Sequence, residues 1–289
     1  MPVPDAWGGG GGIPVEAWKT LMREGGMGKT SLSDSSVIAA TARSGVASDR
    51  ETTKQASPCE EWNPVEKTIF ERRSVRWYKS DQVPEHLVRR ILEAGRYAPS
   101  AGNSQPWKFI VIRDKTMLEE MERDVQRTCK LFRFFLDFRR PGVMGKIGWV
   151  YSQIFIRILP HELHPIPLGA IFLIAEGKLK LFHGAPTVIM ILKDKRGVSN
   201  PDLDCGICGQ NMVLAAHSLG LSTCWIGFVS ALMKSYVRFK WLRRLHISYP
   251  YELVEGIALG YARGNPNKMV ERETHEIAWY ENGRRTITY

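Results

Sequence analysis

Long apolar runs are missing from this 289-residue chain, which contains no uninterrupted apolar stretch of about 18 residues, the length that a membrane-spanning helix needs. Its first residues, Met1–Asp5, have neither a charged n-region nor an apolar h-region, so we expect no secretory signal. Cysteine is scarce and odd in number, which predicts free thiols in a reducing compartment, the cytoplasm, rather than a disulfide framework. The five cysteines are Cys59, Cys129, Cys205, Cys208 and Cys224.

Complete metal-binding and P-loop motifs are also missing. Cys205 and Cys208 have the CxxC spacing, but no second CxxC or His pair supplies the other two ligands of a zinc site. The stretch 161–164 contains two histidines and a glutamate without forming HExxH. Gly25–Thr30 ends like a P-loop, but Arg23 stands where that motif needs glycine, and no apolar strand precedes it. We therefore expect neither a metal site nor a P-loop.

Low-complexity composition is confined to the first part of the chain. Gly8–Gly12 is a glycine run, and Thr30–Lys54 is dominated by Ser, Thr, Ala and single charges. Such a segment has little apolar surface to offset the entropy of ordering. We predict a flexible extension over residues 1–60 and a folded domain over residues 61–289, with an insert at about 126–183.

Positive charge is concentrated in the predicted domain. The chain carries a net charge of +10, while residues 1–60 carry a net charge of −1. Lys234–Arg244 is the densest basic run, and the insert is basic as well. These runs are either solvated helix faces or surfaces that attract an anionic cofactor, an acidic membrane or nucleic acid.

Apolar periodicity predicts alternating helices and strands, typical of an α+β or α/β fold. The expected helices cover 64–72, 84–97, 117–125, a segment capped by Asp202 or Asp204 and ending at Leu219, and 230–245; the expected strands cover 107–112, 187–192, 222–228 and 251–261. The apolar segments of the insert form either helices that cap a site or an interfacial amphipathic patch. The tail after Gly264 is predicted to be polar and extended.

Two segments have the chemistry of a nucleotide site. Arg72, Arg73, Ser74 and Arg76 follow the first predicted helix, and guanidinium groups bind phosphate through paired, charge-assisted hydrogen bonds. Ala98–Trp107 (APSAGNSQPW) combines two prolines with Ser, Asn and Gln, which predicts a rigid hydrogen-bonding rim for a planar ligand.

These segments, together with Asp204–Gly227 and Leu253–Tyr261, resemble motifs of the nitroreductase family over nearly all of residues 63–289. The resemblance implies an α+β fold with a central, mainly antiparallel sheet flanked by helices. It also implies a homodimer with flavin mononucleotide (FMN) at the interface. The implied activity is hydride transfer from NADH or NADPH to a nitroaromatic, quinone or similar small acceptor by a ping-pong mechanism.

The same resemblance assigns residues. Arg72, Arg73, Ser74 and Arg76 are expected at the phosphate and the nearby flavin edge, and Lys268 or Arg272 is expected to add a late basic contact to the phosphate. Backbone groups of Ile226 and Gly227 are expected at the flavin N5/O4 side. The partner subunit is expected to contribute Pro99, Ser100, Ala101 and Asn103. Because the flavin is the reactive group, no catalytic residue of the protein is assigned.

One departure from the family leaves the acceptor open. Some members carry an acidic residue before the glycine of the third predicted strand, where this chain has Ile226. A reductive dehalogenase or a flavin-consuming enzyme on the same fold is therefore an alternative. A basic module that binds membranes or nucleic acid is an alternative of another class. For the flavoenzyme we expect no nucleic-acid partner, and only weak contact with an anionic membrane surface.

Overall fold

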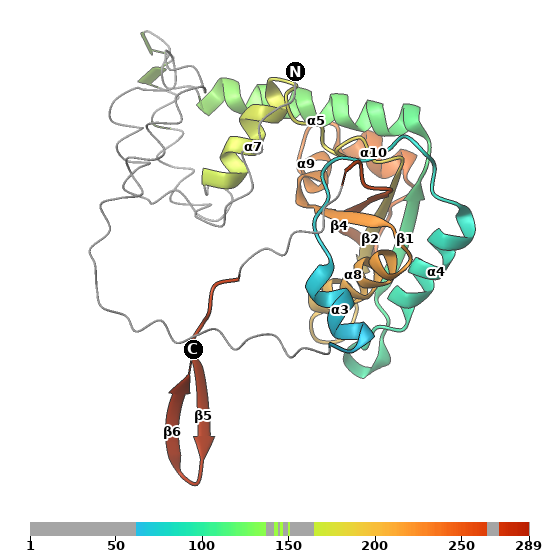
Figure 1. Ribbon diagram of the computed structural model, residues 1–289. Coiled ribbons are helices and arrows are strands. Elements are labelled where there is room, and N and C mark those ends of the chain that lie inside the picture. The colour runs from blue at the N-terminus through green and yellow to red at the C-terminus, as the bar shows by residue number, and fades with distance from the viewer. Residues whose placement is uncertain are drawn as a thin grey trace. The chain divides into compact units, whose positions relative to one another are not determined.

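The computed structural model describes residues 62–136, 142–143, 145–146, 150, 165–264 and 272–288 (Figure 1). These residues belong to two compact units, with residues 62–264 in one and residues 272–288 in the other, and each unit is described by itself. The predicted extension over residues 1–60, most of the apolar insert before Pro165, and Lys268 lie outside the described residues.

The larger unit contains a four-stranded sheet in which every neighbouring pair is antiparallel. Its strands, in spatial order, are β1 (Trp107–Ile112), β2 (Thr187–Asp194), β4 (Tyr251–Gly260) and β3 (Ser222–Ile226). The first six residues of β2 are buried, because alternate side chains enter apolar clusters on opposite faces of the sheet. This burial explains the uninterrupted apolar run that predicted the strand.

Helices cover both faces of the sheet (Figure 1). On one face lies α8 (Pro201–Ser218), with α4 (Glu85–Arg96) packed against it. The apolar cluster of the other face takes side chains from four other helices. These are α5 (Lys115–Leu136), α7 (Pro165–Ala175), α9 (Ser230–Met233) and α10 (Arg238–Arg244).

Glycine allows α8 to lie very close to its neighbours. A Cβ atom on Gly209 would stand 2.2 Å from the Trp225 ring of β3. A Cβ atom on Gly95 of α4 would stand 2.7 Å from the Met212 side chain of α8. Side chains at either position would push the layers apart, so these glycines set the distance between α8 and the sheet and between α8 and α4.

The α+β fold with a central antiparallel sheet confirms the predicted fold class. The cap of α8 differs from the prediction: the Asn200 side chain, not Asp202 or Asp204, accepts the Leu203 N–H at 3.2 Å. The helix predicted over 117–125 is longer and continues to Leu136.

The single basic helix predicted over 230–245 is wrong, since the chain forms α9 and then α10. Between them, the Ser235 hydroxyl donates to the Leu232 carbonyl at 3.1 Å, a local bond that competes with helix continuation.

The polar tail forms a hairpin of β5 (Ile277–Glu281) and β6 (Arg284–Thr288) rather than a wholly extended segment. Asn282 and Gly283, with φ of 49° and 74°, form its two-residue turn. Asn-Gly favours this turn because both residues tolerate positive φ, so the signal was present in the sequence. Within the described parts of the chain, no helix combines the length and apolar character needed to cross a membrane.

The first helix, α3 (Pro64–Glu71), is fixed at its start by a capping box. The Asn63 side chain accepts from the Glu66 backbone, and the Glu66 side chain accepts from the Asn63 backbone. This cap defines where the helix begins and therefore where Arg72 leaves it.

A buried carboxylate joins α5 to α10. Asp124 is almost fully buried and accepts from Lys240 Nζ at 2.5 Å and from the indole Nε1 of fully buried Trp241 at 3.0 Å. Glu120, one turn earlier, pairs with Lys240 at 2.7 Å and with Arg244. Part of the basic run at 234–244 is thus neutralised within the fold.

We expect Asp124→Ala to lower the free energy of unfolding by about 3 kcal/mol, because the buried indole N–H loses its acceptor and Lys240 loses a partner. Urea unfolding followed by far-UV circular dichroism measures the change. Glu119→Ala is the control, since its pair with exposed Lys115 at 4.0 Å should contribute less than about 0.5 kcal/mol. Equal losses in the two variants would contradict this role for Asp124.

Candidate functional site

Residues 72–76, the arginine segment, lie extended along an edge of the sheet. Ser74 bridges to Thr223 of β3, and the Val75 N–H donates to the Thr223 carbonyl at 2.9 Å. Val75 is buried, whereas Ser74 and Arg76 on either side of it are exposed, as side-chain alternation in an extended segment requires. The predicted phosphate residues therefore gather beside the start of β3.

Arg73 has a different position from its neighbours. Its Nη1 donates to the carbonyls of Phe70 and Arg72, both at 2.7 Å, where α3 ends. The last carbonyls of a helix lack partners within the helix, and this guanidinium satisfies them. Arg73 thus holds the turn that leads into the segment.

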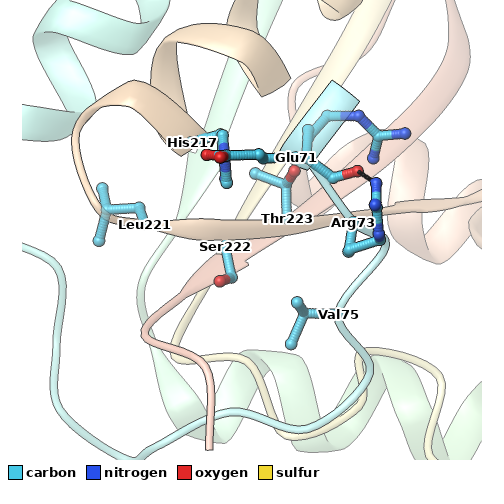
Figure 2. A pocket seen from close by; sticks show the side chains of 8 residues that line it. Glu71, Arg73, Val75, His217, Leu221, Ser222 and Thr223 are labelled. Carbon is cyan, nitrogen blue, oxygen red and sulfur yellow. Dashed lines mark hydrogen bonds between the residues drawn. The ribbon is translucent and has the colours of Figure 1, made fainter. Parts of the chain in front are cut away.

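A small cavity lies behind this turn (Figure 2). It is lined by Glu71, Arg72, Arg73, Val75, His217, Leu221, Ser222 and Thr223. Its volume of about 10 Å³ has room for about one water molecule, so it is no cofactor pocket. His217, at the end of α8, has its pKa lowered mainly by burial; the Glu71 carboxylate opposes this shift, and the Arg72 and Arg73 charges add to it.

Arg76 acts electrostatically on buried groups around it. His183 has φ of 56°, and burial, with the Arg76 charge second, lowers its pKa to about 4. Burial raises the pKa of Tyr78 and of Cys224, and the Arg76 charge opposes both shifts. Arg76 therefore acts on the buried Tyr78 and Cys224 and on the half-buried His183.

A carboxylate lies at the opposite end of β3. The Glu255 oxygens of β4 are 3.2 and 3.6 Å from where a Cβ on Gly227 would stand. Glu255 is half-buried, and burial raises its pKa. Our sequence reasoning missed this residue, although Glu255 is the one charge in the otherwise uncharged stretch Leu253–Gly260. The glycine predicted at the flavin N5/O4 side thus has an acid beside it.

The loop before β1 is rigid and strained. Gly102, Asn103 and Gln105 have φ of 57°, 53° and 45°, a region that costs energy for residues other than glycine. The Gln105 backbone N–H donates to the Ser100 hydroxyl at 3.0 Å, and the Gln105 side-chain amide donates to Oδ1 of the Asn103 side chain at 3.0 Å. These bonds hold the loop before β1, the predicted rim loop, in one conformation.

Asp204 of α8 anchors this loop. It is buried, and both carboxylate oxygens lie 3.3 Å from the Ala101 backbone nitrogen, which donates to them. The sequence indicated Asp204 only as a candidate helix cap. Its contact with Ala101, 103 residues away in the chain, depends on the packing of α8 and left no local signal.

The two predicted parts of the site lie far apart within one chain. β1 and β3 are at opposite edges of the sheet, and strand register places Ser74 near the Thr187–Leu259 end, whereas Trp107 pairs with Lys193 at the other end. Four interstrand spacings of about 4.8 Å, including the one from β3 to the arginine segment, and six residues of about 3.4 Å along the strands separate the loop from the arginine segment by roughly 28 Å. One chain does not bring them together.

An open cleft of about 540 Å³ adjoins the loop. It is lined by Ser104, Gln105, Pro106, Asp194, Arg196, Gly197, Val198 and Tyr251. The guanidinium of Arg196 is held by the two Asp194 oxygens at 3.0 and 2.6 Å. The cleft walls mix polar and apolar groups, and the guanidinium of Arg196 is already paired.

The remaining candidates are placed as follows. Arg272 belongs to the smaller unit, and Lys268 is outside the described residues, so the late phosphate contact stays a prediction. Cys205 and Cys208 are buried, and burial raises the pKa of each thiol to about 12, which keeps both protonated. Across the described ranges, no three His, Cys, Asp or Glu side chains are grouped to hold a metal ion.

The model of the Nitroreductase family matches residues 69–261. A relative from Methanothermobacter thermautotrophicus, provisionally named an NADH dehydrogenase/NAD(P)H nitroreductase, is 30% identical over 207 residues, covering 70% of this chain and 79% of its own. One from Archaeoglobus fulgidus with the same name is 28% identical, covering 68% and 84%. A nitroreductase structure from Desulfitobacterium hafniense with bound FMN has a TM-score of 0.54 and 26% identity, covering 73% of this chain and 96% of its own.

The family match and the NAD(P)H nitroreductase relatives identify the chain as an enzyme of the oxidoreductase class. The chain belongs to the nitroreductase family. The resemblance stated from the sequence is thereby confirmed.

We expect the stability of the protein to fall below about pH 6.5 in a way that depends on His183. Its folded-state pKa of about 4 lies below the ordinary value of 6.5, so the unfolded chain binds more protons between these values. Stability that is present above pH 6.5 is lost as pH falls toward 4, by an amount on the order of 2–3 kcal/mol.

Urea unfolding of the wild type and of His183→Gln, at several pH values across this window, measures the effect. The variant should show a flatter pH dependence, because its side chain does not titrate. The mildly shifted His217 offers the matched comparison His217→Gln, with a smaller change. Parallel pH profiles for wild type and His183→Gln would contradict this assignment.

Proposed function

We propose that this chain binds FMN and transfers hydride from NADH or NADPH to a small acceptor such as a nitroaromatic or a quinone. The observation that carries the proposal is the arrangement along β3, with cationic residues at its start and Ile226–Gly227 at its end. FMN has a phosphate at one end and a ring system at the other, joined by the ribityl chain. The family and the FMN-bound structure of its relative from Desulfitobacterium hafniense support the cofactor.

The exposed residues of the arginine segment suit a phosphate group. Arg76 and Ser74 are exposed beside the sheet edge, and Arg72 follows directly after α3. Arg73 supports them from the helix end and binds the phosphate less directly, because its guanidinium also holds two carbonyls. Lys268 or Arg272 is proposed as the late basic contact. A phosphate that carries nearly two negative charges at neutral pH balances this positive field.

Two subunits are needed for a complete site. The rim loop with Pro99, Ser100, Ala101 and Asn103 lies roughly 28 Å from the arginine segment of its own chain, estimated from strand spacing. In a twofold-symmetric homodimer, the loop of one protomer can close the site of the other, and each of two equivalent sites then takes both parts. We therefore propose a homodimer.

The bound flavin supplies the hydride chemistry, accepting a hydride from the nicotinamide and passing it to the acceptor. The protein orients both substrates against the cofactor. Gly227 lets backbone approach the ring edge, since it has no side chain there, and Arg76 supplies positive charge. If the nicotinamide and the acceptor use the same face in turn, the mechanism is ping-pong. A halogenated aromatic in the acceptor panel distinguishes reductive dehalogenation from nitro or quinone reduction.

A basic binding module is a weaker candidate. The basic run of α10 motivated it, but Lys240 and Arg244 pair with Asp124 and Glu120 of α5. Charges engaged within the fold contribute less to a nucleic-acid or membrane surface than solvated ones do.

Absorption spectroscopy of the purified chain tests the cofactor. We expect a flavin band near ~450 nm, bleached by NADH or NADPH without air, and FMN on heat release. Arg76→Ala should weaken FMN binding about tenfold or more, because a charge-assisted phosphate contact contributes on the order of 1.5–3 kcal/mol. Arg90→Ala is the control, because Arg90 is an exposed residue of α4. A colourless protein that takes up no added FMN would overturn the proposal.

Mixing two defective variants tests the shared site. Arg76→Ala damages the arginine segment, and Asp204→Ala releases the Ala101 loop. Each alone should bind FMN poorly, but a mixed dimer has one site built from two intact parts. After unfolding and co-refolding in equal amounts, we expect about a quarter of the sites to recover full affinity. No recovery, with both variants folded and dimeric, would place the whole site in one chain.

A further inference from the structure

Glu255 lies at the ring end of the proposed site and has no role in the binding described above. Its carboxylate oxygens are 3.2 and 3.6 Å from the Cβ position of Gly227, so the acid occupies the space beside the glycine. Gly227 itself is exposed. The carboxylate is therefore next to the place where the Gly227 backbone would meet the ring of a bound flavin, and protons from solvent can reach it.

The surroundings of Glu255 supply no compensating charge. Across the strands, Ile191 of β2 is its register partner, and on the other side of β4 Gly256 pairs with Ile226 of β3. Burial is the single cause of its raised pKa, and no charged side chain contributes. Among the described residues, neither a hydrogen bond nor an ion pair holds this carboxylate. Such a group responds strongly to any new charge beside it.

Reduction of the cofactor brings that charge. A hydride carries two electrons and one proton, so a bound FMN gains one negative charge when it accepts a hydride. Arg76 is near Cys224 and His183, toward the start of β3, and does not act on Glu255. Two negative charges within a few ångströms disfavour each other, and the carboxylate relieves this by binding a proton.

We propose, on the basis of the proposed FMN function, that Glu255 takes up one proton each time two electrons enter the cofactor beside Gly227. The balance is complete: the donor loses a hydride, the cofactor gains two electrons and one proton, and solvent supplies a second proton to the carboxylate. Oxidation by an acceptor reverses the change, so the acid releases its proton beside the site where a reduced acceptor needs one. Glu255 is thus a positioning and proton-holding residue.

Potentiometric titration of the FMN-loaded full chain tests this, between about pH 7 and pH 8.5. Two protons per two electrons give a slope of up to about 59 mV per pH unit in the wild type, and one proton gives about 30 mV in Glu255→Gln. Glu252→Gln is the matched control, because Glu252 is exposed on the same strand and pairs with Lys195. It should keep the wild-type slope. Equal slopes in wild type and Glu255→Gln would overturn the inference.

A second measurement needs no variant. Anaerobic reduction of the loaded wild type by NADH in weak buffer, followed with a pH indicator, should consume up to one proton per flavin, whereas the hydride transfer alone consumes none. Bleaching without proton uptake would refute the role of Glu255 and leave the proposed function intact. If NADH fails to bleach the flavin, the proposed function fails, and the dithionite-driven potentiometric titration still decides the role of Glu255.

Discussion

The close packing of α8 against the sheet is the constraint on which the two halves of the candidate site depend. It is possible because Gly209 leaves room for the Trp225 ring and Gly95 leaves room for Met212. Near its beginning, α8 presents Asp204 to the Ala101 backbone, and at its end it presents His217 to the cavity behind the arginine turn. Because protein interiors are close-packed, a helix packed this tightly is fixed in position relative to the sheet at both of its ends. The helix α8 thus positions both the rim loop and the surroundings of the arginine segment.

Charge is distributed along β3 in a way that suits a cofactor with unlike ends. Arg76 lies toward the first residues of the strand, where burial and then the Arg76 charge lower the pKa of His183. Glu255 lies by the glycine that follows the last residue of the strand. The positive end matches a phosphate, and the acidic end lies where the redox state changes the charge. Electrostatic groups fixed before the ligand arrives need no rearrangement when it binds or reacts.

Much of the fold could be predicted from the sequence, because the informative patterns are local. The run Thr187–Leu192 indicated a strand buried on both faces, and Trp107–Ile112 was predicted with its observed bounds. The predictions were wrong where local hydrogen bonds and turns compete with regular secondary structure. The Ser235 hydroxyl interrupts the predicted basic helix, and the Asn282–Gly283 turn converts the tail into a hairpin. The α8 cap was misassigned because Asn200, Asp202 and Asp204 are all acceptable caps, and only the backbone path selects Asn200.

For the site, residue types in sequence determined the family, the kind of cofactor expected and the segments that would bind it, because arginines near a helix end and a Pro/Ser/Asn/Gln loop have recognisable chemistry. Tertiary structure alone decided which groups work together. It separated the rim loop from the arginine segment across the sheet, and it brought Glu255 of one strand to the glycine after another. These contacts join residues far apart in the chain, and strand order and register set them, so no local pattern records them.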